Sequence, residues 1–217
     1  MASSFFNPKG AATRFLTSIC NLIIVNLLFI ITSIPVFSLG ASLTALYRIT
    51  IAIVAGDNPA VFREYLKAFK DNFLRSTLLL LLYTALSGFF IFEIYMVRTM
   101  MEPQFAWAQY PAYFFLFAIA ASSLYSFPLI AWFDTSFKQM LKNSLLLAIT
   151  NLPITIMYIV ITAVMAYLIY EFTIIPLSFM VFMGISILAW FYSLFHKKIF
   201  EKNGVTLIPK DDLEKED

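Results

Sequence analysis

Few side chains in this sequence of 217 residues could do chemistry. His196 is the only histidine and Cys20 the only cysteine, so the chain can form neither an intrachain disulfide nor a site with several thiolate ligands. His196 precedes two lysines at the end of an apolar run, a position typical of a helix C-terminus at a membrane interface. No zinc-protease HExxH motif, nucleophile elbow or phosphate-binding glycine loop occurs. We therefore predict no catalytic residue, no metal site, no cofactor and no enzymatic activity.

Two ionisable residues inside apolar runs, Arg48 and Glu93, are the remaining candidates for a functional role. They lie at different depths of their segments and are not expected to pair. Arg48 is expected to extend toward cytoplasmic lipid phosphates or to reach Asp57 or Asp134, because a long arginine side chain can bring its charge out of hydrocarbon. Contact with a partner or a substrate is the functional alternative.

The elements that carry these residues are membrane helices. Hydrophobic residues make up 61% of the chain and charged residues 13%, whereas globular domains are about half apolar and about a quarter charged. The apolar runs approach the length of about 20 residues that a helix needs to cross a bilayer. We predict an all-α, polytopic membrane helix bundle whose single membrane domain covers residues 1–195. Its six segments are about 15–34, 36–55, 76–97, 109–132, 153–170 and 173–195, followed by a charged cytoplasmic tail, 196–217.

Positive charges orient these segments. Lysine and arginine are concentrated before the first segment, between the second and third, between the fourth and fifth, and after the last. Because basic loops stay cytoplasmic, we expect both termini inside and residues 98–108 and 170–173 outside. The alternative is five full spans with 36–55 re-entrant or interfacial and the N-terminus outside. A net charge of +2, spread along flanking segments, does not favour a nucleic-acid partner.

Pro35 and Gly40 are predicted to form the turn between the first two segments, on the outer side. Proline lacks a backbone donor and ends a helix, and glycine permits either a positive φ or a close backbone approach. The return leg is short, since residues 41–55 span only about 22 Å at helical rise. The second segment is therefore either a short, tilted span or a re-entrant one.

Two cytoplasmic segments, 59–75 and 136–150, are predicted to be amphipathic helices lying on the membrane surface. In the first, Phe62, Leu66, Phe69 and Phe73 form one apolar face, with Asn58 as the expected N-cap. In the second, Ser136 and Gln139 fit a capping box, and Asn151-Leu-Pro153 interrupts the helix before the next span. The candidate polar or partner contacts are Arg48, Phe62, Phe69, Lys70 and Asn151.

The two halves also share a pattern. Phe69-Lys70 with Ser76 matches Phe137-Lys138 with Ser144 at the same internal spacing, and Thr44-Ala-Leu-Tyr47 matches Ser122-Ser-Leu-Tyr125. A parallel repeat of span, surface helix and span would explain this pattern. A chance match between leucine-rich sequences is the alternative.

Residues Pro35 through Tyr47, with Gly40, Ala41 and Ala45, resemble the signature of the YesL-like bacterial membrane proteins. The resemblance extends over about residues 5–85 and includes Phe69-Lys70-Asp-Asn-Phe73. It implies a family of unknown function whose members are often encoded beside carbohydrate ABC transporters. The chain lacks a recognisable EAA-type loop, so it does not resemble an ABC permease itself.

Two functions remain open from the sequence. The first is a non-enzymatic accessory membrane subunit that contacts the lipid bilayer and binds the permease of a carbohydrate ABC uptake system. The second is a small transporter or channel in its own right, either as a single chain or as an oligomer. A cavity lined by Asn21, Asn26, Arg48 or Asn151 would favour the second function, and an interior filled by apolar side chains would exclude it.

Overall fold

The computed structural model describes residues 11–172 and 178–203, which are almost entirely helical and contain no strand. Six helices within these ranges are long and apolar enough to cross a membrane: Phe15–Ser33, Val36–Ala55, Val61–Met100, Gln104–Trp132, Leu152–Phe172 and Met180–Lys202. The predicted fold class is therefore confirmed. Of the predicted sixth segment, 173–195, residues 173–177 lie outside the described part.

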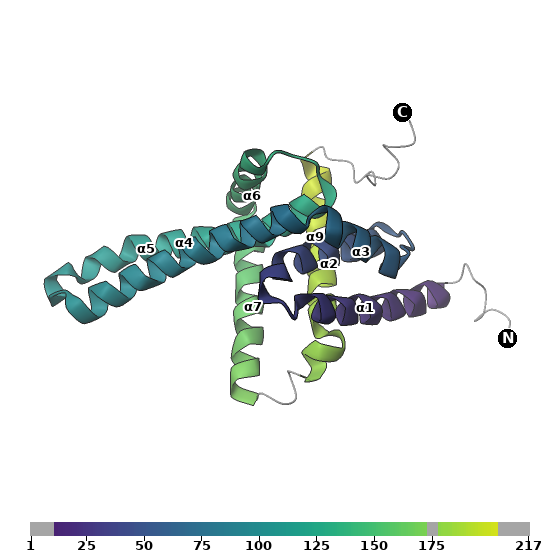
Figure 1. Cartoon of the computed structure of the whole chain (residues 1–217), viewed down its shortest axis with the longest axis horizontal. Coiled ribbons are helices and arrows are strands. Elements are labelled where there is room, and N and C mark those ends of the chain that lie inside the picture. The colour runs from purple at the N-terminus through teal and green to yellow at the C-terminus, as the bar shows by residue number, and fades with distance from the viewer. Residues whose placement is uncertain (1–10, 173–177, 204–217) are drawn as a thin grey trace.

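The described residues form three antiparallel pairs of helices, joined by two short helices (Figure 1). The first pair is α1 (Ala11–Ser33) and α2 (Leu39–Ala55), with the 3₁₀ turn η2 (Val36–Ser38) between them. The second is α4 (Phe73–Met100) and α5 (Gln109–Trp132), joined by η3 (Pro103–Ala108). The third is α7 (Leu152–Phe172) and α9 (Ile185–Lys202), which the π-helical turn η4 (Met180–Gly184) precedes. α3 (Val61–Asp71) and α6 (Phe137–Thr150) connect the pairs.

The second helix of each pair forms the core. α2 packs against α1, α3, α4, α5 and α9. In its most apolar stretch 72% of the residues are buried, against 11% in those of α4 and α7. Small residues of α2, including Ala41 and Ala45, are fully buried, which allows its neighbours to approach closely. The outer helices α1, α4 and α7 leave many apolar side chains exposed, as expected for surfaces that face lipid.

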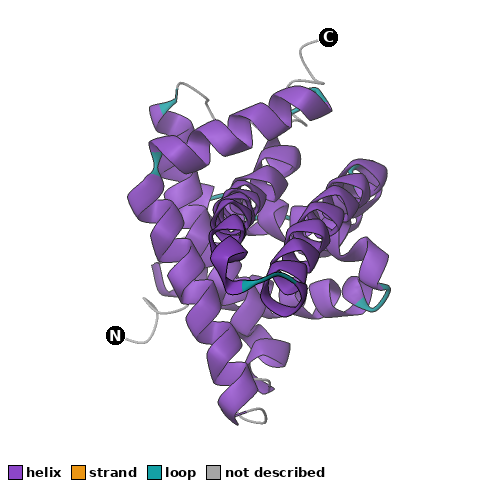
Figure 2. Ribbon diagram, turned by 90° about the vertical axis from the view of Figure 1, so that its left-hand side faces the viewer, coloured by secondary structure: helices purple, strands orange, loops and turns teal. Residues whose placement is uncertain are grey.

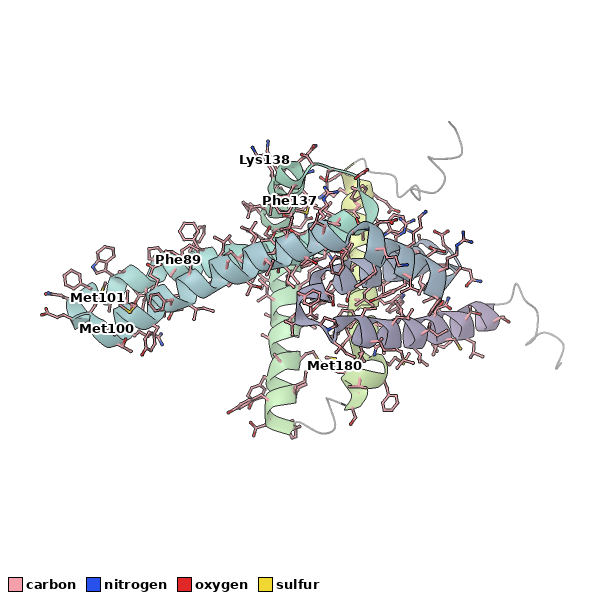
Figure 3. All side chains as sticks on the ribbon, in the orientation of Figure 1. Phe89, Met100, Met101, Phe137, Lys138 and Met180 are labelled. Atoms are coloured by element: carbon pink, nitrogen blue, oxygen red, sulfur yellow. The ribbon has the colours of Figure 1, made fainter. Side chains whose placement is uncertain are left out.

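The α4–α5 pair projects from this core as an arm that runs crosswise to α7 and α9 (Figure 1). When the molecule is turned by 90°, the tip of the arm points at the viewer, and the two helices of the arm are seen foreshortened in front of the rest (Figure 2). Phe89, Met100 and Met101 lie along it with exposed side chains (Figure 3). At the tip, Arg98 donates hydrogen bonds to Gln109 and Tyr113, at 3.0 and 2.6 Å, and thereby ties the two helices together.

The Pro35 turn was predicted to lie on the opposite membrane face from the segment 59–75, and this prediction is wrong. The rings of Phe37, in the turn, and Phe73, at the start of α4, are in edge contact with centroids 6.4 Å apart. The Thr32 hydroxyl also lies 2.7 Å from that of Tyr65 in α3. Because about 30 Å of hydrocarbon separates the two membrane faces, the turn and residues 65–73 cannot lie on opposite faces.

Of the two residues predicted to form this turn, Pro35 lies in it and Gly40 does not. Pro35 does precede η2, and α1 ends at Ser33. Gly40, however, lies inside the first turn of α2, and the glycine with positive φ in the described part is Gly56, at 95°. A Cβ on Gly40 would lie 2.3 Å from the carbonyl oxygen of Ser76 in α4. Gly40 is therefore a site of close helix approach, and the turn itself is Ile34–Ser38.

The predicted helix at 59–75 is divided. α3 ends at Asp71, and α4 begins at Phe73 and continues directly into the arm. Its N-cap is not Asn58: the helix begins at Val61, and the Glu64 side chain accepts a hydrogen bond from the Ala60 N–H at 2.8 Å. The second short helix agrees with prediction, since Ser136 accepts from the Gln139 N–H and α6 breaks at Asn151.

Candidate functional site

Arg48 lies on the most buried helix, and only 8% of its surface is exposed. Its guanidinium carbon lies 4.3 Å from the centroid of the Trp132 ring, so the charge stacks on the indole face. Its Nη1 atom has no hydrogen-bond partner among the described residues. Neither expected acidic partner reaches it, because Asp134 pairs with Arg75 at 3.5 Å and Asp57 lines a separate pocket.

The contact with Trp132 does not by itself compensate for burying this charge. Removing an ion from water costs several kcal/mol even after the protein relaxes. A desolvated cation–π contact returns about 2 kcal/mol. A buried arginine is normally paired or fully hydrogen-bonded, and the stacked geometry leaves at least one donor group of Arg48 unsatisfied. This imbalance marks Arg48 as a functional candidate.

All the buried side-chain nitrogen atoms without a partner in the described ranges belong to four residues: Arg48, Arg75, Trp132 and His196. Each of them is linked to the C-terminal end of α5 by a contact of its own. Arg48 covers the Trp132 ring, whose own Nε1 is one of the unpaired donors. Arg75 comes from the start of α4 and contacts Asp134, two residues beyond Trp132. Arg48 and Trp132 thus hold unpaired N–H groups side by side, and Arg75 holds a third one on a residue that contacts the segment following α5.

His196 enters the same region from α9. The sequence predicted an interfacial residue, but His196 is fully buried and neither ring nitrogen has a described partner. Its ring is in edge contact with Tyr47 and Tyr125 and stacks on Phe200, which packs against Phe133 at the end of α5. The sequence did not predict this burial, because His196 stands next to two lysines where the apolar run ends. The helix α9 nevertheless continues for six residues beyond His196.

Two sets of contacts agree with the predicted parallel repeat. The hydroxyls of Thr44 and Ser76 lie 2.8 Å apart, and those of the matching residues Ser122 and Ser144 also lie 2.8 Å apart. The matching tyrosines, Tyr47 and Tyr125, both contact the His196 ring. The helix breaks do not match, because Ser76 lies in α4 whereas Ser144 lies in α6. The order of span, surface helix and span therefore does not hold for both copies.

Asn26 of α1 satisfies backbone groups around the π-helical turn η4. Its side-chain amide donates to the carbonyl oxygens of Met180 and Val181 at 3.1 and 2.6 Å, and its side-chain oxygen accepts from the Ser186 N–H at 2.9 Å. π-helical turns disturb the regular hydrogen-bond pattern, so the backbone needs outside partners there. Asn26 is fully committed to this structural role.

The other predicted contact residues are not brought together. Phe62 and Lys70 are exposed on α3, whose buried side chains are Val61, Tyr65 and Ala68, so the predicted apolar face is shifted by one residue. Phe69 is partly buried against the Phe73 ring. Asn151 donates to the Leu147 carbonyl oxygen at the break between α6 and α7. None of these four lies at the end of α5.

Two pockets open on the described surface. The larger, of about 440 Å³, lies between α1 and the C-terminal end of α2. Its lining is mainly hydroxyl, amide and carboxylate groups: Thr13, Thr17, Ser18, Asn21, Ile53, Gly56, Asp57 and Asn58. The smaller, of about 270 Å³, lies between α5, α6 and α9 and is mainly apolar, with Phe133 and Phe200 in its wall. No group of three His, Cys, Asp or Glu residues that could hold a metal ion gathers in the part of the chain described.

Comparison with known proteins finds a similarity over part of the chain. Residues 22–94, from α1 into the C-terminal part of α4, match a family described as "Protein of unknown function, DUF624". This stretch contains Pro35, Gly40 and Arg48. No curated protein matches the chain. No solved structure matches it either.

Proposed function

We propose that the chain is a non-enzymatic accessory subunit of a bacterial plasma membrane that binds the permease of a carbohydrate ABC uptake system. The resemblance of Pro35 through Tyr47 to the YesL-like proteins supports this partner. The match to a family of unknown function covers the same stretch and is compatible with it. The C-terminus and the basic segment around α3 are proposed to lie in the cytoplasm, following the distribution of basic residues. Because the Pro35 turn is in contact with the start of α4, a membrane-spanning α1 then begins on the outer side, so the N-terminus is proposed to lie outside, as in the alternative topology with five full spans.

The observation that carries the proposal is the projecting α4–α5 arm. Beyond the core, its side chains Phe89, Phe92 and Phe114 are 64%, 60% and 68% exposed, while Phe90 and Phe115 stack between the helices at 4.9 Å. The arm is thus internally packed and apolar on its outer faces. Association of helices in lipid depends on close packing, so a preformed pair of helices offers a surface for the helices of another membrane protein.

Affinity purification from the native membrane tests this proposal. The tagged chain in mild detergent is expected to co-purify with an ABC permease. Phe89→Ala combined with Phe92→Ala should reduce the recovered permease at least tenfold. The matched control, Tyr167→Ala with Phe172→Ala, removes two aromatic residues that are 61% exposed on α7 and should leave recovery unchanged. Recovery of the chain alone, or with unrelated proteins only, would contradict the proposal.

The polar pocket supports a second candidate, a small transporter. The pocket is lined by Asn21, one of the four residues whose presence in a cavity would favour this function. Asn26, Arg48 and Asn151 do not line it, and each has a different environment. The pocket opens beside the start of α1. The hydroxyl groups within the core form hydrogen bonds with one another between helices, so they act as packing contacts and do not line this pocket.

Reconstitution separates the two candidates. Purified protein in liposomes should show no uptake of radiolabelled maltose or glucose above protein-free liposomes if the chain is an accessory subunit. Saturable uptake that Asn21→Leu abolishes, with the melting temperature unchanged, would favour the transporter instead.

A further inference from the structure

We propose that the end of α5 is a binding site for an oxyanion of the phosphate type, held by Arg48 and Trp132 with Arg75 at its edge. Arg48 is more than nine-tenths buried and has an unpaired Nη1, and Trp132 is 3% exposed with an unpaired Nε1. Since Arg48 stacks on the Trp132 ring, these donor groups are neighbours. An anion that accepts hydrogen bonds from them satisfies both the unpaired donors and the buried charge.

The charges nearby favour an anion over a neutral ligand. Arg48 and Arg75 contribute two positive charges to the end of α5, and Asp134 contributes one negative charge. Asp134 is turned toward solvent, with 87% of its side chain exposed, and its contact with Arg75 is long at 3.5 Å. The Nη2 atom of Arg75 is buried and unpaired, so Arg75 retains a donor for a second oxygen.

The chemistry of the donors favours phosphate over a halide. The guanidinium group is planar and presents several N–H groups in a fixed arrangement that matches two oxygens of one phosphate or carboxylate. The indole N–H adds a further donor. A phosphate can come from a lipid headgroup or from solution, and both present the same oxygens to Arg48. The experiment below distinguishes these two sources.

Trp132 provides a direct measurement of occupancy. The chain has three tryptophans, so Trp107→Phe with Trp190→Phe leaves Trp132 as the only one. Its fluorescence in the purified full-length chain is followed during titration with sodium phosphate, with sodium chloride at equal ionic strength as the reference. A second titration uses phosphatidylglycerol added to phosphatidylcholine nanodiscs that contain the chain.

A saturable change in Trp132 emission with phosphate, absent with chloride, is the expected result for an anion from solution. A change with phosphatidylglycerol alone supports the same site occupied by a lipid headgroup. Arg48→Gln should weaken the response at least tenfold, and Arg48→Lys, which keeps the charge but loses the planar group, should weaken it as well. Arg63→Gln removes a charge from the exposed face of α3 and should have no effect.

Two outcomes would overturn the proposal. One is the absence of a saturable response to either probe in the folded protein, which means that the buried donors do not take an anion. The other is a response of undiminished affinity in Arg48→Gln and Arg48→Lys, which places the anion elsewhere. If Arg48→Gln does not fold, the comparison of Arg48→Lys with Arg63→Gln remains decisive.

Discussion

The side-chain oxygen of Asn26 in α1 accepts a hydrogen bond from the backbone N–H of Ser186, 160 residues later in the chain, at 2.9 Å. The same side chain donates to Met180 and Val181, so a single amide joins the first helix to the turn that precedes the last one. Because Asn26 is fully buried, no water replaces these bonds when the amide is removed.

Asn26→Leu should therefore lower the stability of the folded protein by about 2 kcal/mol, because it leaves buried backbone groups unpaired. The melting temperature in detergent measures the effect. Asn21→Leu is the matched control, since Asn21 makes one long side-chain bond, 3.4 Å to Asn58, in an exposed setting. An equal loss in both variants would show that the three bonds of Asn26 do not stabilise η4.

Gly40→Ala should destabilise the protein, because the added Cβ would lie 2.3 Å from the Ser76 carbonyl oxygen and force α2 away from α4. Overpacking of this kind costs about 1–3 kcal/mol. Gly88→Ala in α4 is the control: nothing lies within 4 Å of its added Cβ, so stability should stay equal or rise. The melting temperatures of Gly40→Ala and Gly88→Ala are compared in the same detergent. A Gly40→Ala protein as stable as the unmodified chain would exclude the close approach of α2 to α4 at this position.

Labelling tests whether the Pro35 turn and the start of α4 share one membrane face. Val36 and Leu74 are 73% and 71% exposed and flank the contact between Phe37 and Phe73. With Cys20 replaced by serine, Val36→Cys and Leu74→Cys should respond alike to a membrane-impermeant thiol reagent. Both should be labelled from the same side, or both should be protected by lipid. Labelling of the two positions from opposite sides would contradict the contact.

His196→Phe should leave stability unchanged or raise it, whereas His196→Ala should lower it by about 3 kcal/mol. The imidazole is enclosed by aromatic rings and its nitrogens have no described partner, so an apolar ring of similar size loses no hydrogen bond. Alanine instead leaves a cavity. Chemical denaturation of the two variants measures this difference. A large loss in His196→Phe would show that the imidazole is hydrogen-bonded in the membrane.

Composition and run length determined the class of this protein. With 61% hydrophobic residues, the helices must form wherever about 20 apolar residues follow one another, because a backbone in lipid has to satisfy its own hydrogen bonds. The breaks at Pro35 and Asn151 were equally local, since proline removes a backbone donor and Asn151 bonds back to Leu147. For these reasons the six segments and the helix at 136–150 could be predicted.

Only the tertiary structure decided which faces meet. The membrane-spanning helices are apolar on nearly every side, so periodicity does not distinguish a side that faces lipid from one that faces protein. The Trp132 ring under Arg48, the burial of His196 and the shifted face of α3 depend on contacts between distant segments. The contact of Phe37 with Phe73 has the same origin. Packing of whole helices sets these positions, and it does so through shape, which a linear pattern of apolar residues does not encode.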